Sequence, residues 1–126
     1  MTNEVNITIW GRDFELPVRF DCFENETITA KQKQALETLL LSSYLIENSK
    51  QKVENYCKEQ VDSDDANTQK SNIFSYIKPL YIYVTRDEPH AKVSIMCNYR
   101  YDLEHGLAVT FLQDRSIIVS DQDSIL

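Results

Sequence analysis

Apolar and polar residues alternate along both ends of this chain, whereas apolar residues in the middle follow helical spacing. The clearest alternation puts Phe14, Leu16, Val18 and Phe20 on one face of residues 14–20, which is typical of a half-buried strand. Similar alternation predicts further strands over residues 5–10, 80–85, 93–101, 107–111 and 116–119.

The middle of the chain predicts two helices. Thr29 and Gln32 have the residue types and spacing of a capping box, which marks the start of a helix. Leucines at helical spacing follow, so we expect a first helix over residues 29–47. A polar pair at residues 48–49 predicts a break, and a second helix is expected over residues 50–60.

The order of these elements predicts the fold class. Short connections between strands favour antiparallel pairing, and helices grouped between the two sets of strands favour segregation to one face of a sheet. We therefore predict a single α+β domain over residues 1–126. It has an antiparallel sheet of five to six strands, with two helices packed on one face and no parallel βαβ order.

Charge and hydropathy restrict the partners. The net charge is −7 and the isoelectric point is near 4.7. A negative surface repels phosphates, so we expect no nucleic-acid partner, whereas a basic protein would be attracted. No apolar run approaches the roughly 20 residues that span a bilayer. Residues 1–4 also lack the basic region of a signal peptide, so we expect a cytoplasmic protein with no membrane partner.

The familiar catalytic and metal-binding motifs do not occur in this chain. Cys22, Cys57 and Cys97 form neither a C-x-x-C pair nor an even disulfide set, so we expect buried free thiols. With two glycines, the chain contains no glycine-rich nucleotide-binding loop. We therefore predict no cofactor and no metal site.

Residues 101–107, with the sequence Y-D-L-E-H-G-L, place several ionisable side chains in one short connection. Asp102, Glu104 and His105 are residue types that serve acid–base chemistry, and Cys97 would add a thiol to a small hydrolase. Three interpretations of this connection are open. It is a structural turn in which glycine supplies a positive φ, or it contacts a partner, or it is a catalytic site. Because side chains in a hairpin loop point apart, we predict no enzymatic activity.

Two further segments contain candidate residues for binding a protein partner. Tyr81 and Tyr83 alternate with aliphatic residues, so they line the second face of a central strand or form an open face for a partner. Residues 62–65 form an acidic loop without the spacing of a calcium site. The predicted partner-binding residues are Asp62, Asp64, Asp65, Tyr81, Tyr83, Asp102 and Glu104.

Both ends of the chain resemble a family of small bacterial domains of unknown function. Residues 10–21 read W-G-R-D-F-x-L-x-V-x-F-D, and residues 101–109 are similar to the family's W-D-x-E-H-G-(L/I)-(A/G) hairpin, with Tyr101 replacing the commoner tryptophan. Residues 122–126 resemble its closing segment. Members look similar to immunity-type proteins found near bacterial toxin genes, which implies a binder that neutralises a toxin.

The resemblance and the charge together lead to one functional prediction. We expect a non-catalytic cytoplasmic binding protein, an immunity protein that neutralises a toxin with a basic surface by direct contact. The alternatives are a small structural or housekeeping domain without a toxin partner, and a small hydrolase that uses His105.

Overall fold

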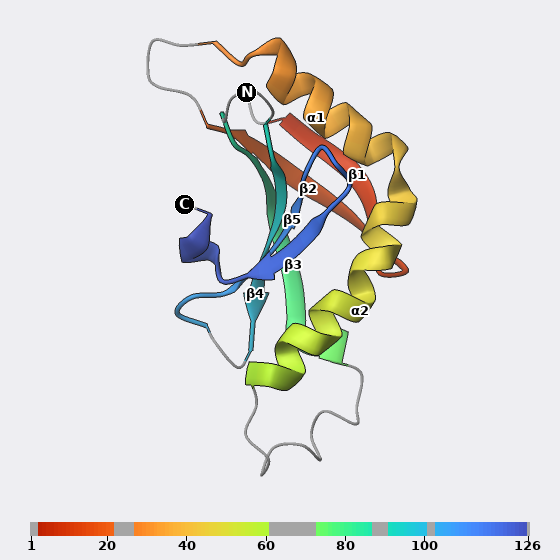
Figure 1. Ribbon diagram of the computed structural model, residues 1–126, viewed down its shortest axis with the longest axis vertical. Helices are drawn as coiled ribbons and strands as arrows, with labels where there is room; N and C mark the ends of the chain where they lie inside the picture. The colour runs from red at the N-terminus through yellow and green to blue at the C-terminus, as the bar shows by residue number, and fades with distance from the viewer. Residues whose placement is uncertain (1–2, 22–26, 61–72, 87–90, 101–102, 126) are drawn as a thin grey trace.

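The computed structural model describes residues 3–21, 27–60, 73–86, 91–100 and 103–125. In this part of the chain, the alternating runs form one six-stranded sheet, and both helices lie on the same side of it (Figure 1). The elements in chain order are β1 (Asn3–Ile9), β2 (Arg12–Phe20), α1 (Ala30–Leu41), α2 (Ser43–Gln60), the 3-10 helix η3 (Ile73–Tyr76), β3 (Ile77–Val84), β4 (Val93–Tyr99), β5 (Leu107–Phe111), β6 (Ile117–Ser120) and the 3-10 helix η4 (Gln122–Ser124).

The strands follow one another in the sheet in the order of the sequence, from β1 to β6. The predicted α+β class is confirmed, but the prediction that all strands pair antiparallel is wrong for one pair. β2 and β3 run parallel and pair residues 18–20 with residues 82–84, whereas every other neighbouring pair is antiparallel. The reason is that two helices separate β2 from β3, and a crossover of that length allows the next strand to run in the same direction.

The start of α1 is tied to the ends of this parallel pair. Thr29 and Gln32 form the predicted capping box: the Thr29 hydroxyl accepts from the Gln32 N–H at 3.1 Å, and Gln32 Oε1 accepts from the Thr29 N–H at 2.9 Å. The buried Gln32 Nε2 also donates to the carbonyls of Asp21 at 3.0 Å and Val84 at 3.4 Å. One side chain therefore caps the helix and satisfies backbone acceptors where β2 and β3 end.

The two helices are divided at Ser42, so the predicted break at residues 48–49 is wrong. The Ser42 N–H donates to the Leu39 carbonyl at 3.0 Å and thereby closes α1. Ser49 stays within α2 because its buried hydroxyl donates to the Ile46 carbonyl one turn earlier. A serine that satisfies its hydroxyl inside the helix does not interrupt it.

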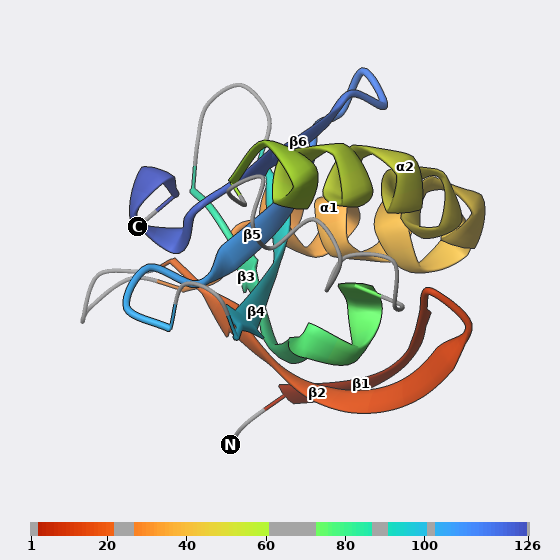
Figure 2. The same ribbon diagram turned by 90° about the horizontal axis from the view of Figure 1, so that it is seen from below.

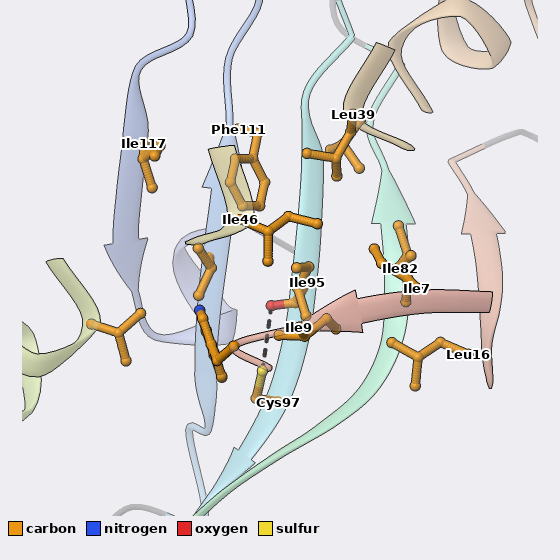
Figure 3. Close-up of a cluster of buried hydrophobic side chains, with 14 of the residues drawn as sticks. Ile7, Ile9, Leu16, Leu39, Ile46, Ile82, Ile95, Cys97, Phe111 and Ile117 are labelled. Atoms are coloured by element: carbon orange, nitrogen blue, oxygen red, sulfur yellow. Dashed lines mark hydrogen bonds between the residues drawn. The ribbon is translucent and has the colours of Figure 1, made fainter. Parts of the chain in front are cut away.

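The core lies between the helices and the inner face of the sheet. Figure 3 shows Ile82 of β3 and Ile95 of β4 in one cluster with Leu39 of α1 and Ile46 of α2, all of them buried. The β1–β2 ribbon curves on the side away from the helices, with η3 between them (Figure 2). Apolar residues of β1 and β2 therefore join the same core, which is why their alternation is so regular.

Trp10 and Gly11 form the two-residue turn between β1 and β2, with φ values of 50° and 84°. Positive φ at both positions is characteristic of a type I′ turn, whose twist suits a hairpin, but it is strained for a side chain as large as an indole. Trp10 is nevertheless only 5% exposed, and its ring centroid lies 4.8 Å from that of Phe74. Its Nε1 donates to the Ser49 Oγ at 2.9 Å, so the hairpin is anchored to α2 and η3.

We expect Ser49→Ala to lower the free energy of unfolding by about 1–3 kcal/mol, because it leaves the buried indole N–H without its acceptor. Trp10→Phe removes the donor. Combining the two changes should cost less than the sum of the single changes, since neither group is then left unpaired. Urea denaturation followed by circular dichroism measures all three variants, and Asn48→Ala, at an exposed neighbour in α2, is the control. Strictly additive costs would contradict this coupling.

Candidate functional site

The connection between β4 and β5 is held by the C-terminal segment. The Gln122 N–H donates to the His105 carbonyl at 3.0 Å, and Gln122 Nε2 donates to the Cys97 carbonyl at 2.8 Å. Gly106 has a φ of +66°, and a Cβ at this position would lie 2.7 Å from Gln122 Nε2 and 2.8 Å from the Cys97 oxygen. The glycine is therefore required both for the backbone conformation and for the close approach of Gln122.

The ionisable side chains of this connection are largely exposed to solvent. Glu104 is exposed, and His105 Nε2 lies 3.9 Å from Asp123 Oδ2, in a pair whose side chains are 43% and 70% exposed. Such exposed pairs contribute little energy and are strongly screened. Asp102 lies outside the described residues. The contacts with Gln122 and this exposure favour a structural turn over a catalytic corner.

Cys57 and Cys97 are free and buried, as predicted for the thiols, while Cys22 lies outside the described residues. Cys97 is 0% exposed, and its Sγ lies 3.8 Å from the Ile95 carbonyl oxygen, the contact dashed in Figure 3. Burial raises the pKa of the Cys97 thiol far above its ordinary value, and the neighbouring Cys57 raises it further. Because the thiolate is the nucleophilic form, this environment suits a structural thiol.

Tyr81 and Tyr83 lie on the face of the sheet that points away from the helices. They alternate with Ile82 and Val84, which are fully buried in the core, while the tyrosines themselves are half-buried. The guanidinium of the exposed Arg19 lies over the Tyr81 ring, 5.0 Å from its centroid. We refer to these three side chains as the Arg19–Tyr81–Tyr83 patch.

The centre of this outer face is buried. A row of paired residues crosses it from β2 to β6: Arg19, Tyr83, Ser94, Thr110 and Ile118. Ser94 and Thr110 are at most 1% exposed and share a hydrogen bond of 2.8 Å, whereas Ile118 is 47% exposed. The outer face is therefore accessible at its two sides, where the patch and Ile118 lie, and buried between them.

A cavity of about 310 Å³ opens between α1 and the turn that joins β5 to β6. Its lining from α1 includes Lys31, Ala35 and Leu39, which recur every four residues and so share one helix face. Phe111 and Arg115 line it from the opposite side. The sequence contains the helical spacing, but no local signal shows that β5 and its turn face this helix, so this site was not predicted.

The acidic loop, the absence of a metal site and the absence of a membrane span are the remaining predictions. The acids Asp62, Asp64 and Asp65 lie outside the described residues. Within the described ranges, no three His, Cys, Asp or Glu side chains gather closely enough to hold a metal ion. In the same ranges, no helix is both long and apolar enough to cross a membrane.

The structure is a small α+β fold with an accessible tyrosine–arginine patch on one side of its sheet and a cavity on the other. The chain belongs to the DUF6985 family, described as a domain of unknown function, whose model matches residues 1–126. The expected membership of an uncharacterised domain family is thereby confirmed. No curated protein and no solved structure matches the chain.

We expect Gly106→Ala to cost more stability than Gly11→Ala. Both changes place an L-residue at positive φ, which costs roughly 1–2 kcal/mol. An added Cβ at Gly11 meets nothing within 4 Å, whereas at Gly106 it meets Gln122 and the Cys97 carbonyl. This overpacking adds about 1–3 kcal/mol. Urea denaturation compares the two variants, and adding Gln122→Ala should recover part of the Gly106→Ala cost. Equal costs at the two glycines would argue against the close packing.

Native Cys97 should resist iodoacetamide at pH 8 and react only after unfolding in guanidinium chloride. Its thiol is inaccessible, and its raised pKa suppresses the thiolate. Peptide mapping by mass spectrometry measures the labelling, with glutathione in the same reaction as the reactive control. Rapid labelling of Cys97 in the folded protein would restore it as a candidate nucleophile.

Proposed function

We propose that this domain is a non-catalytic protein-binding module that neutralises a bacterial toxin by direct contact. The observation that carries the proposal is the Arg19–Tyr81–Tyr83 patch, where a guanidinium lies over one of two half-buried tyrosine rings. Tyrosine and arginine are enriched among the residues that dominate protein interfaces. A rigid central strand presents both tyrosines, so little conformational entropy is lost when a partner binds.

The charge of the chain supports a basic partner. With a net charge of −7, the domain would attract a positively charged toxin and accelerate the encounter. Glu104 is exposed beside the C-terminal segment. The other acids predicted to contact a partner, Asp62, Asp64, Asp65 and Asp102, lie outside the described residues. Residues 101–109 resemble the hairpin of a family of unknown function whose members look similar to immunity-type proteins, which is the reason to propose a toxin as the partner. The lack of a basic signal region and of a long apolar run is the reason to propose the cytoplasm as the location.

The hydrolase alternative is less compatible with the described residues. Cys97 is fully buried with a raised pKa, and His105 pairs with a solvent-exposed carboxylate. A general base needs a fixed position beside the proton that it removes. A structural or housekeeping domain without a toxin is the competing outcome of the experiment below.

The test uses the product of the gene that neighbours this one. We expect co-expression of the wild-type domain to relieve growth inhibition by that product, and calorimetry to show direct binding. The double change Tyr81→Ala, Tyr83→Ala should weaken binding by roughly tenfold or more, as for interface residues that contribute more than about 1.4 kcal/mol. Tyr44→Ala, at a tyrosine on α2 that is 49% exposed, is the matched control and should bind normally.

A charge-reversal pair tests the electrostatic part separately. Glu104→Lys should slow association with the basic partner, and the difference should shrink at high salt, because salt screens exposed charges. Glu37→Lys, on an exposed position of α1, makes the same change of charge on the helical side and should have a smaller effect. Circular dichroism verifies that each variant is folded. A neighbouring product that neither inhibits growth nor binds the domain would favour the housekeeping alternative.

A further inference from the structure

We propose that the cavity between α1 and the β5–β6 turn is a binding site for a small organic acid, an aromatic or branched apolar group that carries one carboxylate. The cavity lies on the helical side of the sheet, whereas the Arg19–Tyr81–Tyr83 patch lies on the other side. The inference therefore does not rest on the proposed toxin-binding function.

The volume of the cavity suits a small molecule. It measures about 310 Å³. An engineered apolar cavity of about 150 Å³ binds benzene, so this one has room for a ligand of roughly two rings. It also falls at the lower end of the volumes of ordinary ligand pockets, which start near 300 Å³. A ligand of that size would be enclosed on the helical and the sheet side together.

The inner part of the cavity is apolar. Leu39 of α1, Leu45 at the start of α2, Val93 of β4 and Phe111 of β5 all line it, and each is at least nine-tenths buried. These side chains belong to the main core, so their positions are set by packing that does not depend on a ligand. The apolar end of a ligand would therefore meet a preformed surface.

The charged side chains among the described residues that line the outer part of the cavity are cations. Lys31 and Arg115 line it, and no carboxylate occurs among its described lining residues, although the net charge of the chain is −7. Gln34, Thr38 and Gln113 add hydrogen-bond donors. Cationic and neutral donors around an apolar interior are the chemistry that recognises an apolar carboxylate.

The backbone at Arg115 is a second, independent observation. Its φ of 72° lies in the left-handed region, which glycine and asparagine occupy at little cost and arginine does not. The turn is fixed there, because the Arg115 N–H donates to the Leu112 carbonyl at 3.0 Å and the Ser116 N–H donates to Asp114 Oδ1 at 2.9 Å. The hairpin loop itself needs a left-handed residue here, since the Leu112 N–H donates to the Ser116 carbonyl across it. The use of arginine at a position that suits glycine agrees with a role for its side chain at the edge of the cavity.

The experiment compares two probes with the same ring system and head groups of similar size, one charged and one neutral. 1-Naphthaleneacetate carries a carboxylate, and 1-naphthaleneacetamide has the same ring system without the charge. We expect ¹⁵N-HSQC titration of the wild-type protein to show saturable shifts at Leu39, Phe111 and Arg115 with the acid. The acid should bind at least about tenfold more tightly than the amide, as expected for one charge-assisted contact. Shifts located elsewhere, or equal affinity for both probes, would overturn the proposal.

Three variants identify the cations that are responsible. Arg115→Asn removes the charge and places at this positive φ a residue that adopts it at lower cost, so the thermal midpoint should be unchanged or higher. The affinity of this variant for the acid should fall about tenfold. Lys31→Gln should also weaken binding of the acid without changing binding of the amide. Lys33→Gln, at an exposed lysine of α1 outside the cavity lining, is the matched control and should bind like the wild type. Unchanged acid affinity in both Arg115→Asn and Lys31→Gln would contradict the assignment.

Discussion

The hydrogen bond from the Trp10 indole to Ser49 joins the turn of the β1–β2 hairpin to the helical layer. The β1–β2 ribbon pairs with β3 through residues 18–20, with one more hydrogen bond from the Asp21 N–H to the Val84 carbonyl, so its opposite end needs a separate anchor. Trp10 provides one anchor by reaching α2 through Ser49 and η3 through Phe74. Arg12 provides another by donating to the carbonyls of Phe74 at 3.0 Å and Ile77 at 3.4 Å. Burial of the indole offsets the cost of its left-handed backbone. The Ser49 hydroxyl that accepts from the indole also donates to the Ile46 carbonyl, and this second bond explains why α2 continues through a serine.

Two glutamine side chains solve a similar problem at other places in the fold. Gln32 donates to the carbonyls of Asp21 and Val84 where the parallel strands end, and Gln122 donates to the Cys97 carbonyl where β4 meets its connection. A backbone carbonyl removed from water needs a partner, and a long amide side chain can supply one from a distant element. Residues 103–107 and the closing segment therefore form one structural unit, and the approach of Gln122 explains why Gly106 is a glycine.

The patch and the cavity lie on opposite sides of the sheet. The Arg19–Tyr81–Tyr83 patch is formed by β2 and β3 on the outer face, and the cavity is formed by α1 and the β5–β6 turn on the helical side. A protein on the patch and a small acid in the cavity would not compete for the same surface. The local chemistry also differs: two tyrosine rings form most of the patch, whereas the charged side chains described in the cavity lining are the cations Lys31 and Arg115.

Local sequence patterns determined which elements form, whereas contacts between distant residues decided how they are arranged. Alternation at Phe14 to Phe20 and the capping box at Thr29 predict their elements correctly, because both signals depend on neighbours a few residues away. The parallel pair, the cavity and the anchoring of the β1–β2 hairpin all join residues far apart in the chain; Trp10 and Ser49, for example, are 39 positions apart. Periodicity shows which face of an element is apolar but not which element covers it. Only the tertiary structure could therefore place Arg115 opposite α1 and bury Ser94 and Thr110 on the same face of the sheet as the tyrosines.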